Sequence, residues 1–417
     1  MKQILRYLKW LYPGMQVKRW VALLMGGILL FSLGALILGI HLPFSTWASE
    51  ISALWSIPLL LLGLFLVSVG MRKLNISLLS VVIPRREEEI VEIVYSRRYL
   101  SYGPRFAAIG GGTGLHNLLR GLKKYTNNLT AIVTVADDGG SSGRLRRELG
   151  IIPPGDIRNC LVALAEAEPL LENLFQYRFT DGDELRGHAV GNILLAAMTK
   201  VSGSFDKAVE ELSRVLAIRG RVIPSALEPL VLVAQMADGS VIRGESSIPR
   251  AGKRLVELSL QEKKPANPQA IQAIREAEYL LLGPGSLFTS ILPNLLLDEI
   301  TQAINRSRAK KIYICNIMTQ SGETDGFTCE DHLRVLLKYI DHIDYVIVNR
   351  FVPVRLKKKY AEEMAYPVEY DVLSLMKMGI RPVIRDMVDI RSEYAHHNPA
   401  LLAQVIMEIV EMTKRQI

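Results

Sequence analysis

Two adjacent carboxylates, Asp137 and Asp138, follow an apolar, β-branched run at residues 130–136. If this run is a strand of a doubly wound sheet, both acids stand at the carboxyl end, where such sheets bind ligands, and a carboxylate there can hold ribose hydroxyls or a divalent metal. The next residues offer hydroxyls and a cation to a phosphate group: Ser141, Ser142 and Arg144. A solvated polar loop with helix caps is the alternative interpretation. We predict that Asp137 and Asp138 bind ligand, with Asp138 as candidate metal ligand and both as candidate catalytic groups.

A glycine-rich turn at residues 110–114 precedes this pair and joins an apolar run, residues 105–109, to a segment with leucines at helical spacing. A strand, a glycine turn and a helix in this order aim free backbone N–H groups at an anion, and glycine permits the close approach. The turn is not a Walker A loop, since no Gly-Lys-Ser/Thr follows, and not a complete G-x-G-x-x-G motif, since Leu115 stands at the final glycine position. A tight connection without a ligand is the alternative. The predicted phosphate-binding residues are Gly111, Gly112, Thr113 and Gly114.

Two further polar clusters precede apolar helical segments. In the first, Asp156 is placed to cap the helix that follows, whereas Arg158 and Asn159 are not explained by capping. In the second, His188 and Asn192 open a helix. His188 can donate to a ligand or act as a general acid or base, although a lone histidine is more often structural. All five residues are candidate ligand-binding residues, and His188 is also a candidate for catalysis.

Glycines and hydroxyls recur after a predicted strand at residues 279–282. The candidate binding residues there are Gly283, Gly285, Ser286 and Asn294. A further strand at residues 311–315 leads into Asn316, and a hairpin without a chemical role is predicted at residues 231–250. Several strands thus end in polar, glycine-rich loops, which is the arrangement of a ligand site along one end of a parallel sheet. The predicted fold class is α/β, with a Rossmann-like, doubly wound and mainly parallel sheet.

Two uncharged apolar runs, at about residues 21–40 and 52–71, stand near the start of the chain. Each has the length that a helix needs to cross the hydrocarbon core, and neither shows the polar face of a buried soluble helix. Lys and Arg flank the pair on both outer sides, whereas the connection between the runs has none. The positive-inside rule then predicts a multi-pass helical hairpin in the cell membrane, with both termini and the soluble domain in the cytoplasm. A buried helical pair is the alternative.

The predicted chain has three parts: a two-helix transmembrane anchor at residues 1–73, a linker at 74–104 and a nucleotide-binding domain at 105–417. Residues 1–104 hold 11 Lys and Arg against 5 Asp and Glu, so most of the formal net charge of +8 lies outside the domain. A domain that is close to neutral argues against nucleic acid as a partner. Wide spacing predicts buried free thiols, rather than a zinc site or disulfides, for the three cysteines: Cys160, Cys315 and Cys329.

Seven sequence blocks resemble the CofD-like superfamily and occur in its order, and the resemblance covers nearly all of residues 105–417. They are GGGTGLHNLLRGLKKY, VADDGGSSGRLRRELG, PPGDIRNCLVALAE, GHAVGN, GESSIPRAGK, GPGSLFTSILPNLL and ICNIMTQSGETDG. One block alone is weak evidence for a family, but seven blocks in the same order are highly specific. The segments DDGGSSGRLR and MTQSGETDG are similar to those of the YvcK branch, the gluconeogenesis factors.

The YvcK-like blocks imply binding of a UDP-sugar, above all UDP-N-acetylglucosamine, and a role in cell shape, envelope homeostasis and carbon metabolism rather than catalysis. Outside these blocks, Tyr360 resembles a family aromatic, which implies stacking on a base; a partly buried surface tyrosine is the alternative. The other branch, the 2-phospho-L-lactate transferases, implies the alternative function, which is transfer of a phospholactyl group from a nucleotide donor with Mg²⁺. A membrane adaptor with a vestigial pocket is a third interpretation, and a homo-oligomer is compatible with each.

Two features depart from the family pattern. The apolar hairpin is absent from the commonly described soluble members, so their location is not carried over to this chain. His396 stands where the family has the arginine of an Arg-His-Asn pattern, which changes any contact that this arginine makes with a sugar phosphate. His396 and His397 are adjacent and face apart, so they are not expected to form a metal pair.

Overall fold

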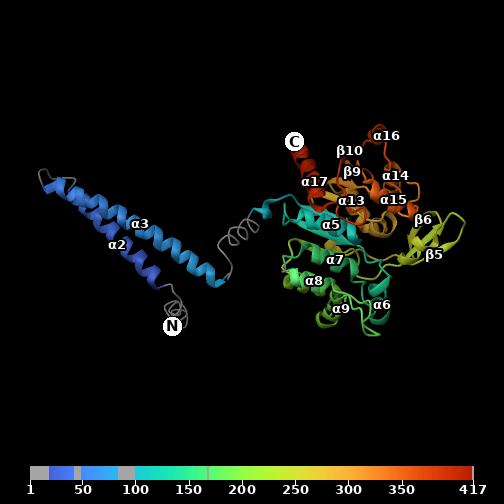
Figure 1. The fold of residues 1–417 in the computed structure, drawn as a ribbon, viewed down its shortest axis with the longest axis horizontal. Coiled ribbons are helices and arrows are strands. Elements are labelled where there is room, and N and C mark those ends of the chain that lie inside the picture. The colour runs from blue at the N-terminus through green and yellow to red at the C-terminus, as the bar shows by residue number, and fades with distance from the viewer. Residues whose placement is uncertain (1–17, 42–47, 83–98, 167–168, 416–417) are drawn as a thin grey trace. The chain divides into compact units, whose positions relative to one another are not determined.

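The structure is a computed structural model (Figure 1), and it describes residues 18–41, 48–82, 99–166 and 169–415. The chain divides into two compact units, Met1–Tyr95 and Ser96–Ile417. The cationic flank before residue 18, the connection between the apolar runs and most of the predicted linker lie outside the described residues.

The first unit is a hairpin of two long helices, α2 (Lys18–His41) and α3 (Ala48–Val82). Two segments are long and apolar enough to cross a membrane, Arg19–Leu38 with a mean hydropathy of 2.6 and Trp55–Ser77 with 1.8. Helix α3 continues to Val82, beyond residue 73, where the sequence suggested that the anchor ends. Length and composition therefore agree with a membrane hairpin, although a signal sequence or a core helix passes the same test.

Glycines line the contact between α2 and α3. A side chain on Gly27 would collide with the backbone of α3, and one on Gly63 would collide with the backbone of α2. Large apolar side chains point away from the contact, as Leu29 is 68% exposed and Phe65 is 62% exposed. Small residues at the contact and apolar side chains outside it are typical of helices that pack in lipid, where burial from water does not drive association.

The second unit is built on a seven-stranded sheet in the order β10-β9-β8-β7-β1-β2-β3, in which all neighbouring strands are parallel. The strands are β1 (Phe106–Gly110), β2 (Leu129–Val133), β3 (Arg221–Pro224), β7 (Tyr279–Leu282), β8 (Lys310–Ile314), β9 (Tyr345–Asn349) and β10 (Arg381–Arg385). Strands β1, β7 and β9 are buried throughout, because helices cover both faces of a parallel sheet. The chain runs from β1 to β3 on one side and then returns to β7 on the other, so β1 and β7 flank the switch point. The predicted Rossmann-like fold is confirmed.

Right-handed crossovers on the two sides of β1 place the flanking helices on opposite faces of the sheet. The helices are α5 (Gly112–Leu122), α6 (Gly140–Leu149), α7 (Gly155–Leu164), α8 (Pro169–Gln176), α9 (Val190–Ser202), α10 (Phe205–Val215), α11 (Pro268–Glu276), α12 (Leu292–Leu295), α13 (Asp298–Arg306), α14 (Cys329–Leu336), α15 (Val354–Glu362), α16 (Val372–Lys377) and α17 (Pro399–Lys414). Short helical turns are η2 (Leu100–Tyr102), η3 (Glu245–Ser247), η4 (Pro249–Ala251) and η5 (Leu287–Ile291). Helix α5 packs against α7 and α17, and α11 packs against α13. The predicted buried free thiols are observed: Cys160, Cys315 and Cys329.

A small antiparallel sheet, in the order β5-β4-β6, is inserted before β7. Its strands are β4 (Leu232–Met236), β5 (Val241–Arg243) and β6 (Leu255–Leu260), so the predicted hairpin at residues 231–250 is present. The turn η3 follows β5, and there the N–H of Ser246 donates to Asp138 Oδ1 at 2.9 Å. The insertion therefore carries Glu245 to the acidic pair that follows β2.

Candidate functional site

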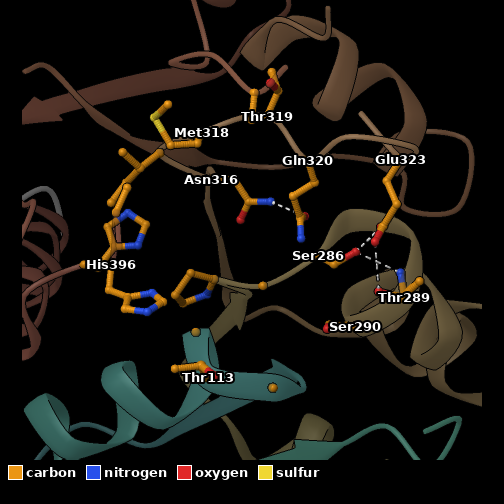
Figure 2. A pocket seen from close by; sticks show the side chains of 18 of the residues that line it. Thr113, Ser286, Thr289, Ser290, Asn316, Met318, Thr319, Gln320, Glu323 and His396 are labelled. Atoms are coloured by element: carbon orange, nitrogen blue, oxygen red, sulfur yellow. Dashed lines mark hydrogen bonds between the residues drawn. The ribbon is translucent and has the colours of Figure 1, made fainter. Parts of the chain in front are cut away.

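A cavity of about 590 Å³ opens at the carboxyl end of the sheet, beside the switch point between β1 and β7. Residues that follow β1, β7 and β8 converge on it, as Figure 2 shows for Thr113, Ser286 and Asn316. The predicted binding residues that line it are Gly111, Gly112, Thr113, Gly114, Gly285, Ser286, Asn316 and Tyr360. Its volume lies within the range of small-molecule sites, so it is the candidate ligand site of this unit.

Two glycine turns form the floor of the cavity. A side chain on Gly114 would overlap the carbonyl of Pro284 in the turn after β7, so glycine is required where these turns touch. Gly112 has a φ of +65°, a backbone conformation that glycine adopts without strain. Helix α5 begins at Gly112, and its first N–H groups are free of intrahelical partners. The predicted strand, glycine turn and helix are present, and they offer donors to an anion.

The turn after β7 presents a hydroxyl and carboxyl network to the cavity (Figure 2). Ser286 Oγ accepts from the N–H of Thr289 at 3.1 Å and donates to the carboxylate of Glu323. Thr289 Oγ1 lies 3.4 Å from Glu323 Oε1. Burial raises the pKa of Glu323, and its bonds to the two hydroxyls oppose this rise. Ser286 is thus held by Glu323, a residue that the sequence placed in a polar loop without naming it as a site residue.

An acidic group lies behind the glycine turn, and it is formed by Asp137, Asp138, Asp156 and Glu245. Burial, then repulsion from Asp137, raises the pKa of Asp156 to about 6. The pKa of Glu245 is raised to about 8 by burial first, and then by Asp137, Asp138 and Asp156. Of the four, Glu245 lines the cavity. The structure therefore brings the predicted acidic pair next to the glycine turn and adds Glu245, which the sequence analysis missed.

Each of the three aspartates already accepts a backbone N–H. Asp156 accepts from Gly112 rather than capping the helix that follows it. Asp137 Oδ1 accepts from Gly139, and Asp138 Oδ1 accepts from Ser246, both at 2.9 Å. These bonds fix the glycine turn, the loop after β2 and the inserted sheet to one another, so they have a structural role as well as the predicted chemical one.

The candidate catalytic histidine belongs to a separate buried cluster at the start of α9. Its Nδ1 lies 3.0 Å from the Oγ of Ser141, and Asn192 Nδ2 donates to the same oxygen at 3.1 Å. Burial and the positive charge of Arg144 lower the pKa of His188. His188 does not line the cavity within the described part of the chain.

The remaining predicted residues do not line the cavity in the described structure. The whole of this set is Asp137, Asp138, Ser141, Ser142, Arg144, Asp156, Arg158, Asn159, His188, Asn192, Gly283 and Asn294. Arg144 donates to the carbonyl of Arg186 at 2.6 Å, and buried Asn294 donates to the carbonyl of Ser290 at 2.9 Å. Buried Arg158 donates from Nη2 to Asn159 at 2.8 Å, while its Nε and Nη1 have no protein partner.

The side wall of the cavity comes from α15 and the loop before α17. Tyr360 lines the cavity, and its hydroxyl accepts the N–H of Ala395 at 3.1 Å, which fixes the loop that carries His396 and His397. Burial lowers the pKa of His396, and it lowers that of His397 to about 4. Both rings are therefore neutral at pH 7. The arginine of the family pattern is replaced by a side chain without charge.

The lining of the cavity is rich in acidic side chains. Its lining includes the carboxyl groups of Glu245, Glu323 and Glu363, and no Lys or Arg side chain among the described residues. No group of three or more His, Cys, Asp or Glu side chains in the described structure could hold a metal ion. The side chains alone thus form an incomplete cation site, and a bound Mg²⁺ would take further oxygen ligands from a phosphate.

The fold and the site define a Rossmann-like α/β protein with a polar cavity at its switch point. A family model described as 2-phospho-L-lactate transferase CofD matches residues 106–388. Gluconeogenesis factor of Bacillus subtilis is 48% identical over 312 residues, which cover 74% of this chain and 98% of that protein. A Nostoc sp. protein named "Putative gluconeogenesis factor" is 44% identical over 422 residues, which cover 97% of this chain and 92% of that one. This chain belongs to the CofD family, and its relatives are gluconeogenesis factors of the YvcK type.

The crystal structure of protein BH3568 from Bacillus halodurans has the same fold. It superimposes with a TM-score of 0.71 at 46% identity, over 73% of this chain and 99% of that chain. The match includes almost all of BH3568 but only about three quarters of this chain. The unit Ser96–Ile417 makes up about the same share of this chain. The counterpart of this unit therefore folds as a separate protein.

Proposed function

We propose that this chain binds a nucleotide-sugar of the UDP-N-acetylglucosamine type and is held at the cell membrane by α2 and α3. The observation that carries the first part is the cavity at the switch point, where two glycine turns meet and the N-terminus of α5 offers free N–H groups. The relatives named as gluconeogenesis factors support a role in carbon metabolism. A role in cell-envelope homeostasis is part of the same proposal.

The charge of the cavity defines how a diphosphate is bound. Without a lysine or arginine in the described lining, the phosphates rely on backbone N–H groups and on a cation that accompanies the ligand. Asp137 lies close enough to Asp156 to raise its pKa, and these two carboxylates are the side chains that would contact a Mg²⁺ ion near the glycine turn. The ion would supply positive charge opposite the diphosphate. Asp138, the predicted metal ligand, likewise has one oxygen engaged by a backbone N–H, that of Ser246.

The two carboxyl groups with raised pKa values supply hydrogen bonds. Glu245 is largely protonated at pH 7, since its pKa lies at about 8. A neutral carboxyl group donates a proton to a phosphate or sugar oxygen and avoids repulsion from the ligand. Tyr360 offers an aromatic face from the side wall, which suits a stacked base.

Three observations support the membrane part of the proposal. The spans Arg19–Leu38 and Trp55–Ser77 have sufficient length and hydropathy. They pack through glycines and expose large apolar side chains. The Nostoc relative matches 97% of this chain, so its similarity extends beyond the unit that other relatives share. With cations on both outer flanks, the soluble unit lies in the cytoplasm.

Calorimetric titration of residues 96–417 tests the ligand. UDP-N-acetylglucosamine, UDP-glucose, GDP and NAD are each added with and without Mg²⁺. Binding of a UDP-sugar in preference to GDP and NAD is the expected result. Absence of UDP-sugar binding at millimolar ligand would overturn the proposal.

A transferase is the second candidate function, and the acidic group beside the cavity is the observation that favours it. Asp137 and Asp156 would hold Mg²⁺ for a nucleotide donor, and Glu245 has a pKa near that of a general acid or base. The family model described as 2-phospho-L-lactate transferase agrees with this alternative. Metal-dependent turnover of a nucleotide donor that is lost in Glu245→Gln would support it, whereas the binding function requires no turnover.

A further inference from the structure

A second cavity, of about 800 Å³, lies at the opposite, amino end of the same sheet. Arg105 precedes β1, Tyr279 begins β7 and Lys310 begins β8, and all three line it. The last turns of α11, α13 and α17 complete the wall with Arg275, Arg306 and Lys414, respectively. This cavity is separate from the nucleotide site, which opens at the carboxyl end.

The amino-end cavity is strongly basic. Its charged lining has one carboxylate, that of Glu278, and six cationic side chains. The cations are Arg105, Arg275, Arg306, Arg308, Lys310 and Lys414. Arg105 pairs with Glu278 at 3.6 Å, and Lys310 pairs with Asp344 at 2.8 Å. The other four cations are exposed and form no ion pair with the described residues.

A structural role explains part of this charge. Arg275, Arg306 and Lys414 stand in the last turns of helices, where a cation interacts favourably with the helix dipole. The dipole does not explain Arg308, which lies outside the helices, or the convergence of three helix ends on one cavity. Unpaired, exposed cations around a concave surface attract an anionic partner.

The chain enters the folded unit at this cavity. Tyr102 of η2 lines it and is 90% exposed, which leaves an aromatic ring at its rim. Sixteen residues separate Val82, the end of α3, from Tyr99, and an extended chain of this length spans at most about 60 Å. The tether of the membrane hairpin is therefore attached to the basic end of the sheet, and a tyrosine at the rim suits the level of lipid headgroups.

We propose that the amino-end cavity and its four unpaired cations bind anionic phospholipid headgroups on the cytoplasmic face of the membrane. This inference rests on the membrane anchoring proposed above. The short tether raises the effective concentration of the surface around the cavity, so weak headgroup contacts are sufficient. Docking in this way leaves the nucleotide site, at the other end of the sheet, open to the cytoplasm.

Vesicle co-sedimentation of residues 96–417 tests the proposal, because the counterpart of this unit folds alone in BH3568. Vesicles of phosphatidylcholine alone are compared with an equal mixture of phosphatidylcholine and phosphatidylglycerol. The test variant replaces Arg275, Arg306, Arg308 and Lys414 with Gln. The matched control variant removes the same charge from exposed cations elsewhere: Arg147, Lys207, Arg243 and Lys358.

The wild-type unit and the control variant are expected to bind only the vesicles with phosphatidylglycerol, and more weakly as salt rises. Each charge lost from the cavity should weaken this binding about fivefold, so the test variant should not sediment. Equal binding of the test variant and the control, or binding of inorganic phosphate without binding of vesicles, would overturn the proposal. Nucleotide titration and thermal unfolding of all three proteins separate this result from loss of the nucleotide site or of the fold.

Discussion

The two ends of the parallel sheet differ in charge. The carboxyl-end cavity, of about 590 Å³, has three glutamates and no Lys or Arg in its described lining, whereas the amino-end cavity, of about 800 Å³, has six cations and one glutamate. Phosphate recognition does not require a basic pocket, since backbone N–H groups and a metal ion supply positive charge at a glycine turn. A basic cavity without a glycine turn is suited to binding an anionic surface through charge alone. The contrast assigns a defined small ligand to one end and an anionic surface to the other.

The largest expected effect on ligand binding comes from a substitution that fills the floor of the carboxyl-end cavity, where the two glycine turns touch. Gly114→Val places a branched side chain against the carbonyl of Pro284, so nucleotide-sugar affinity should fall at least about a hundredfold, a loss of about 3 kcal/mol. Gly110→Ala is the matched control, because its added methyl group meets neighbours at 3.8 Å or more. Titration calorimetry measures both, and vesicle binding should be unchanged in each. Loss of vesicle binding together with nucleotide binding in Gly114→Val would mean that the two ends are not independent.

Glu245→Gln tests the raised pKa at the acidic end. The folded protein holds a proton on Glu245 up to its raised pKa of about 8, while the unfolded chain releases it near the ordinary glutamate pKa of 4.5, so folding stability falls as pH rises between these values. The variant removes this pH dependence and should raise the free energy of unfolding at pH 8 by about 4 kcal/mol, with little change below pH 4.5. Chemical denaturation at several pH values measures the effect. Glu262→Gln, at an exposed position outside the cavity, is the control. If folding stability of Glu245→Gln still fell with pH as in the wild type, the raised pKa of Glu245 would be contradicted.

Removal of Mg²⁺ sharpens the comparison between the two ends. With EDTA present, the affinity for UDP-N-acetylglucosamine should fall about tenfold or more, because the diphosphate loses its counter-ion and the described lining has no Lys or Arg to replace it. Binding to vesicles should not require the metal. Equal nucleotide affinity with and without Mg²⁺, measured by calorimetry, would show that backbone N–H groups are sufficient.

His396→Arg restores the family pattern and adds a cation to the acidic cavity. A charged donor near the phosphates should raise nucleotide-sugar affinity about fivefold and weaken its dependence on Mg²⁺. His342→Arg, an exposed substitution on the amino-end side of β9, is the control for added charge. Calorimetry with and without Mg²⁺ measures both variants. A lower affinity in His396→Arg would place the phosphates away from His396.

The sequence by itself determined the local elements and their order. The leucines of α5 at helical spacing, the glycine turn before them and the β-branched run before Asp137 are local patterns, so a short stretch of sequence was enough to predict each element. The two apolar runs were likewise read from length and composition. Because alternating strands and helices allow few right-handed arrangements, the Rossmann-like sheet followed from these elements.

Tertiary structure alone decided which of the polar residues meet. Glu245 reaches the acidic pair because an inserted sheet folds back across β2, and Glu323 reaches Ser286 because β7 and β8 are neighbours. His188 and Asn192, by contrast, form a buried cluster with Ser141 outside the cavity lining. Sequence periodicity reports which face of an element is buried, but it carries no information on which loops lie side by side. Strand order supplies this information, and it also gathers cations from three distant helix ends into one basic cavity.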